Sequence, residues 1–311
     1  MEVIKIDKLD PTLMESTLTE EECDKLLQEI TDIVNAPEGT TVNQSLREAS
    51  PDLIIAGVTG GLMLIAMIRK YIKNKYSLAA KKILDQSKEL NDLYTKIEDL
   101  LKHDKMARFK HRNDKISTTL KYIVLQDRTN GKMYNIVIDY LVFNADTIIN
   151  SLNQMMDYLN QAKPQDEDAL IANWADSLVK DIDELFTRDH WYIERCVPLL
   201  KSEVYNSVPL EKALMSFKAT FGNIYNWIYA INKTTAEQMT YLQFVEKAYK
   251  SAMATHGNTK ARKEAIDRVF KHTLEKATQS ITFNTGVMDV LTEEIKYYAE
   301  ELNRIYQMIK Q

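Results

Sequence analysis

Residues 53–102 read LIIAGVTGGLMLIAMIRKYIKNKYSLAAKKILDQSKELNDLYTKIEDLLK. The first part, Leu53–Ile68, contains three glycines and no charged residue. The rest is rich in lysine and places Ile83, Leu90 and Ile97 seven residues apart, with charged residues between them. Sixteen helical residues span about 24 Å, less than the roughly 30 Å of bilayer hydrocarbon. The stretch therefore predicts one short, very apolar helix or hairpin, followed by a long coiled-coil-like helix.

The long helix has two interpretations. Leu93 and Leu100 extend the seven-residue pattern, which covers about three heptads, the lower limit for a coiled coil. The favoured interpretation is a helix that packs antiparallel on other helices of the same chain. The alternative is a seam between two copies.

The composition predicts an all-α fold, an elongated multi-helix bundle. Only 8 Gly and 6 Pro occur among 311 residues, too few for the frequent turns of a strand-rich protein. With 45% hydrophobic and 27% charged residues, the chain is neither disordered nor a multi-pass membrane protein. Two cysteines, Cys23 and Cys196, do not suffice for a disulfide-built module and are expected to be small buried hydrophobes.

Local signals place the other helices. Thr19 and Glu22 fit a capping box, which predicts a helix over about 20–34. Apolar spacing predicts helices at 116–127 and 133–159, with a single β-hairpin over 121–138 as the alternative. Further helices are expected at 166–187, 190–206, 210–231, 235–254, 260–280 and 287–309, with Gly222, Gly257 and Gly286 as breakers.

These elements divide into three predicted units. Residues 1–52 form an acidic N-terminal segment with one short helix. Residues 53–162 hold the apolar run and long basic helices. Residues 163–311 form a C-terminal helical bundle that follows the linker at Lys163–Asp166.

Charge is segregated along the chain. Residues 1–52 contain 13 acidic and 4 basic residues, a net charge of −9, whereas residues 69–132 contain 8 acidic and 17 basic residues, a net charge of +9. One interpretation is that the acidic end docks on the basic segment of the same chain. The other is that either end faces a charged partner, such as DNA, lipid headgroups or another subunit.

The apolar run is the first candidate site. It is interpreted either as a core helix or as a membrane or assembly contact, because a helix that is hydrophobic all round suits a buried or membrane setting and glycines allow close helix approach. The candidate contact residues are Leu53, Ile54, Ile55, Gly57, Gly60, Gly61, Leu62, Leu64, Ile65 and Ile68.

The second candidate site lies in residues 102–115, KHDKMARFKHRNDK. Its bases surround the helix axis, so any contact with nucleic acid is expected to be non-specific and directed at phosphate. The alternative is a solvated helix that meets the acidic N-terminus. The candidate phosphate contacts are Lys102, Lys105, Arg108, Lys110, Arg112 and Lys115.

Catalytic and metal signatures are not found. His190 and Glu194 form an isolated pair with no third ligand nearby in the sequence, and the glycines at 57, 60 and 61 are not followed by the Lys-Ser/Thr of a phosphate loop. We therefore expect no enzyme activity, no cofactor, no metal site and no small-molecule substrate.

The order of features resembles the internal virion proteins of large tailed bacteriophages. The similar part runs from the acidic N-terminal segment through the apolar run Leu53–Ile68 to the Lys-rich helix Arg69–Lys102. The resemblance implies a helical protein packed inside the head or tail and in some cases delivered into the host. It also implies loss of a propeptide after a small-x-Glu triplet, for which Ala36-Pro37-Glu38 is a candidate; 87–89 and 299–301 also match.

The expected function is thus structural. The chain would pack against like subunits or packaged DNA, in the virion interior, and could contact a membrane on delivery. The alternative is a membrane-active helical protein, either a pore former or a membrane remodeller. The first residues, Met1–Pro11, lack the apolar core of a secretory signal.

Overall fold

The computed structural model describes residues 15–37, 60–102, 117–123, 203–209 and 235–310. It also describes helical positions 153, 157, 161, 173, 175–177, 179, 180, 183 and 233. These residues are almost entirely helical, as predicted from the scarcity of Gly and Pro.

The first helix, α1, spans Glu20–Val34 and begins as predicted. The Thr19 backbone N–H donates to Glu22 Oε2 at 2.7 Å, and the Glu22 N–H donates to Thr19 Oγ1 at 3.2 Å. This reciprocal pair is a capping box that satisfies two otherwise free donors at the helix start. The apolar stripe of α1 is buried at Cys23, Ile30, Ile33 and Val34. The prediction that Cys23 is a buried hydrophobe is confirmed, while Cys196 lies outside the described residues.

The apolar run does not form a separate short helix or hairpin over its described part. Residues 60–68 are the first turns of α3, a continuous helix of 43 residues over Gly60–Lys102. The lysines that follow do not end the helix, because lysine is a good helix former. Ile83, Leu90 and Ile97 are buried in the core of the same chain. A seam between two copies stays a prediction.

Two further helices, joined by a short turn, follow in the C-terminal part of the chain. A helix at 235–256 matches the prediction for 235–254, and α8 follows over Lys260–Lys310. Gly257 lies in the turn between them, where a Cβ would come within 2.4 Å of the Met253 carbonyl oxygen. Gly257 is therefore a true breaker, because only glycine fits there.

Gly286 is not a breaker, since α8 is continuous for 51 residues. The predicted helices 260–280 and 287–309 are one element. Buried threonines on α8 support its continuity, because their hydroxyls are satisfied within the helix. Thr278 and Thr292 each donate to the carbonyl four residues earlier at 2.8 Å, and Thr285 does so at 3.2 Å.

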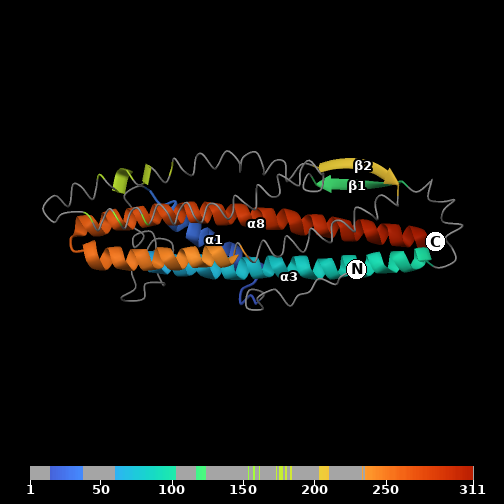
Figure 1. Ribbon diagram of the computed structural model, residues 1–311, viewed down its shortest axis with the longest axis horizontal. Helices are drawn as coiled ribbons and strands as arrows, with labels where there is room; N and C mark the ends of the chain where they lie inside the picture. Colours follow the sequence, from blue (N-terminus) through green and yellow to red (C-terminus); the bar gives the residue numbers. More distant parts are fainter. Residues whose placement is uncertain are drawn as a thin grey trace.

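The three long helices form an elongated rod (Figure 1). α3 and α8 lie side by side and point in the same direction, while the helix at 235–256 runs antiparallel to both. The prediction that α3 packs antiparallel on other helices is therefore right for 235–256 and wrong for α8. α1 packs on α3 and α8. One buried cluster includes residues from α1, α3, 235–256 and α8, so segments of all three predicted units share a core. The unit boundaries themselves stay a prediction.

A two-stranded antiparallel sheet is the exception to the helical architecture. β1, over Ser117–Ile123, pairs with β2, over Glu203–Pro209, with Ser117 opposite Pro209 and Ile123 opposite Glu203. The helix predicted at 116–127 and the end of the one at 190–206 are thus wrong. The alternative, a hairpin over 121–138, correctly placed a strand at 121–123. The partner of this strand in the structure is β2 and not a neighbouring segment of the predicted hairpin. Residues 124–138 lie outside the described part. Both strands are rich in β-branched and aromatic residues, which favour strands.

Candidate functional site

The apolar candidate residues that the structure describes face the protein interior. Leu64, Ile65 and Ile68 are at most 1% exposed, and Gly60 and Gly61 are also buried. Leu62 is partly buried and packs against the same core. Leu53, Ile54, Ile55 and Gly57 lie outside the described residues. The described part of the run is therefore a core element in this form of the protein.

Gly61 makes this packing tight. A Cβ on Gly61 would lie 2.8 Å from Tyr249 Cζ on the helix at 235–256. The Tyr249 ring packs edge-on against Phe270 of α8, with ring centroids 5.0 Å apart, and its hydroxyl donates to Asp267 Oδ1 at 3.1 Å. Because the ring is held on both sides, the close approach requires glycine at 61. These contacts join the starts of α3 and α8 to the end of 235–256.

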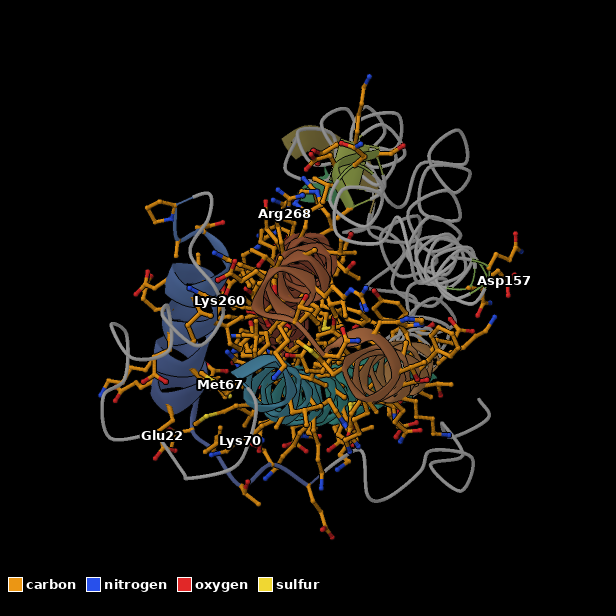
Figure 2. All side chains as sticks on the ribbon, turned by 90° about the vertical axis from the view of Figure 1, so that its left-hand side faces the viewer. Glu22, Met67, Lys70, Asp157, Lys260 and Arg268 are labelled. Atoms are coloured by element: carbon orange, nitrogen blue, oxygen red, sulfur yellow. The ribbon has the colours of Figure 1, made fainter. Side chains whose placement is uncertain are left out.

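The acidic N-terminal helix docks on the basic helix, as one interpretation of the charge segregation predicted. Lys75 Nζ lies 3.3 Å from Asp24 Oδ1, and Lys82 Nζ lies 3.1 Å from Glu20 Oε1. Figure 2 shows α1 on one side of the rod, with the labelled Glu22 near Lys70 of α3. The bonds from Thr19 lower the pKa of the exposed Glu22 carboxyl, and the nearby Lys70 acts in the same direction.

A single amide fixes the chain that leads into α1. Asn74 of α3 is 2% exposed, and its Oδ1 accepts from the backbone N–H groups of Thr17 at 2.7 Å and Leu18 at 3.1 Å. Its Nδ2 donates to the Lys70 carbonyl oxygen at 2.7 Å. Asn74 therefore holds the entry to α1 against α3 through the backbone and not through charge.

The far end of α1 is held by α8. The Lys271 ammonium donates to the Ala36 carbonyl oxygen at 3.0 Å, close to the end of α1, where the helix dipole favours a cation. Burial lowers the pKa of Lys271, while Glu275 and Asp267 act in the opposite direction. The candidate processing triplet begins at this anchored Ala36, and its Glu38 lies outside the described residues.

The basic candidate residues are mostly outside the described part of the chain. Lys102 is the last residue of α3, and Lys105, Arg108, Lys110, Arg112 and Lys115 are not described. Three other lysines of α3, at positions 70, 73 and 81, are exposed, and their side chains form no ion pair with a described residue. Their ammonium groups are accessible to solvent, on the same helix as the lysines that pair with α1.

Sequence reasoning missed Asn74, Tyr249 and Lys271. Each acts on a residue that is distant in sequence, so no local spacing marks it. The one available signal was that Asn74 interrupts an apolar stripe of α3, between Tyr71 and Tyr76.

Among the described residues, no group of three or more His, Cys, Asp or Glu side chains could hold a metal ion. In the same residues, no helix combines the length and apolar character that crossing a membrane requires. Comparison of the chain with protein-family models, curated proteins and solved structures finds no match.

Proposed function

We propose that this chain is a non-enzymatic structural or assembly protein of the phage internal-virion type, which packs against like subunits or packaged DNA. The proposal rests on the rod of long helices that the described residues form. Helices of 43 and 51 residues lie side by side, and buried residues occur along most of their length. A rod of this kind offers long lateral surfaces to neighbours.

The charge arrangement supports contact with a polyanion. Acidic residues of α1 form ion pairs with Lys75 and Lys82 of α3, whereas the α3 lysines at 70, 73 and 81 stay exposed. Dispersed lysines suit contacts to phosphate and carry no means of reading a base sequence. Binding to DNA is therefore expected to be independent of sequence.

The alternative, a membrane-active protein, has less support. Leu64, Ile65 and Ile68 would have to leave the core before α3 could enter a bilayer. Leu62 and Met63 are only partly buried, so these side chains of α3 would contact lipid before the core residues do.

Size-exclusion chromatography with light scattering tests these functions together. The full chain is run alone, with each of two unrelated DNA duplexes, and with vesicles containing anionic lipid. We expect self-association and equal binding to both duplexes that falls steeply between low and physiological salt. The triple variant Lys70→Gln, Lys73→Gln, Lys81→Gln should bind DNA more weakly than the wild type. The matched control removes three lysines of α8, Lys260→Gln, Lys263→Gln, Lys310→Gln, and should lose less affinity than the first variant.

Three outcomes would contradict the proposal or its parts. A monomer that binds neither duplex would exclude the structural function as stated. A preference of tenfold or more for one duplex would show that a recognition surface exists. Binding to vesicles without self-association would favour the membrane-active alternative.

A further inference from the structure

Five lysines follow one another closely on α3, with no acidic residue between positions 69 and 84. We call them the lysine surface; they are Lys70, Lys73, Lys75, Lys81 and Lys82. Lys70 and Lys81 are three helical turns apart and lie on one side of α3, whereas Lys75 and Lys82 are two turns apart and lie on another. The first side is exposed, and the second is the side that pairs with α1. α1 therefore occupies part of a larger basic surface.

Carboxylates from two helices meet the paired side of the lysine surface. On α1, Asp24 Oδ1 lies 3.3 Å from Lys75 Nζ. One turn earlier, Glu20 Oε1 lies 3.1 Å from Lys82 Nζ. On α8, desolvation raises the pKa of the Asp289 carboxyl, and the nearby Lys75 and Lys82 act in the opposite direction. An anion that approaches these two lysines must therefore compete with carboxylates that are already in place.

The ion pairs are not what holds α1 on the rod. The side chains of Glu20 and Asp24 are 51% and 67% exposed, and ion pairs at exposed positions add little to stability. The burial of Ile30 and Ile33, each at most 1% exposed, contributes several times more. Asn74 holds the entry to α1 through backbone N–H groups. The two carboxylates can therefore release their lysines while α1 stays docked.

We propose that α1 is a built-in competitor for the phosphates of DNA, because its Glu20 and Asp24 occupy two cations of the lysine surface. This inference rests on the proposed contact with DNA and adds a means of regulating it. A duplex can reach the three exposed lysines directly, but it gains Lys75 and Lys82 only by displacing groups that carry the same sign of charge as phosphate. The chain therefore binds DNA less tightly than its lysine surface allows, and loss of the two carboxylate charges tightens binding.

Titration of a fluorescent DNA duplex with the full chain, followed by anisotropy at several salt concentrations, tests the proposal. The double variant Glu20→Gln, Asp24→Asn keeps the size of both side chains and removes their charge. We expect it to bind about two- to thirtyfold more tightly than the wild type, the range for the release of two exposed ion pairs. The plot of log K against log salt should be steeper by up to about 1.8, because each added phosphate contact contributes about 0.9.

Two further variants separate local competition from net charge. Glu29→Gln, Asp32→Asn removes the same charge from the other end of α1, where neither residue forms an ion pair with a described residue, and its affinity should rise less. A quadruple variant combines the first double variant with Lys75→Gln and Lys82→Gln. It has the net charge of the wild type and should bind DNA like the wild type, because neither protein offers free cations at these positions.

Deuterium exchange over 20–34 checks that α1 stays docked in the double variant. While the wild type binds DNA, the inference is overturned by an unchanged affinity of the double variant, by an equal gain in the control, or by a gain that survives in the quadruple variant. Loss of protection over 20–34 would also overturn it, because the acids would then hold the helix in place. If neither the wild type nor the double variant binds a duplex, the proposed contact with DNA fails as well, and binding to anionic vesicles alone would assign the lysine surface to lipid headgroups.

Discussion

At the scale of single residues, a buried polar group can fix the path of the chain as firmly as an apolar one. Asn74 is polar and sits within an otherwise apolar face of α3, which ordinarily carries a cost. Here its oxygen accepts from two backbone N–H groups and its nitrogen donates to a carbonyl within α3. All the hydrogen-bonding atoms of the amide are thus used, and residues 17 and 18 have a defined position.

Replacing this amide should release the start of α1. Asn74→Leu leaves the Thr17 N–H without its acceptor and the Leu18 N–H with only Ser16 Oγ, at 3.2 Å, so we expect a loss of about 1–3 kcal/mol in the free energy of unfolding. Urea denaturation measures the loss, and deuterium exchange should show faster uptake over 15–24. The control is Asn303→Leu, the same change at an exposed position of α8. Similar losses for both variants would show that Asn74 holds nothing in place.

At the scale of elements, helices with local start and stop signals were predictable, whereas the full lengths of α3 and α8 were not. α1 and 235–256 were placed from a capping box, apolar spacing and Gly257. α8 was divided at Gly286 because an isolated glycine in a helical pattern resembles a stop. The strands were missed because β1 pairs with β2, some 80 residues away, and no local pattern shows such a partner.

Gly61 of α3 and Gly286 of α8 should respond to alanine in opposite directions. Nothing lies within 4 Å of a Cβ at Gly286, so Gly286→Ala should stabilise the protein by about 0.5–1 kcal/mol by restricting the unfolded chain. Gly61→Ala would push a methyl group against the fixed Tyr249 ring and should destabilise it by about 1–3 kcal/mol. Thermal unfolding of both variants is the measurement. If the thermal midpoints of both variants rise, the Tyr249 ring can move to make room for a methyl group at position 61. If both fall, residue 286 is not in a regular helical conformation.

At the scale of the whole molecule, the all-α class was predictable and the sites were not. Composition and apolar periodicity report how much surface a chain must bury, which determines the class of fold. They do not report which neighbour buries a given residue. For that reason the run beginning at Leu53 could not be assigned to core or membrane from its sequence. Leu64 belongs to a core cluster to which 235–256 and α8 contribute, and these helices lie more than 170 residues further along the chain.

A charge at Leu64 tests whether the run is core. Leu64→Lys places an ammonium at a fully buried position among apolar neighbours, and we expect a loss of more than about 3 kcal/mol or aggregation. Ala66→Lys, two residues on and exposed, is the matched control and should change the thermal midpoint little. Both proteins are also tested by co-sedimentation with vesicles. If Leu64→Lys folds normally but no longer binds vesicles, the segment is a membrane contact and not a core element.

The common direction of α3 and α8 gives the rod an electrical polarity. Each helix carries about half a positive charge at its first residues and half a negative charge at its last. Gly60 and Lys260 mark the same end of the rod, so the two dipoles add, and the shorter antiparallel helix at 235–256 cancels only part of them. Copies placed end to end bring opposite poles together, whereas copies placed side by side in the same direction repel. A filament of this protein would therefore have a preferred direction.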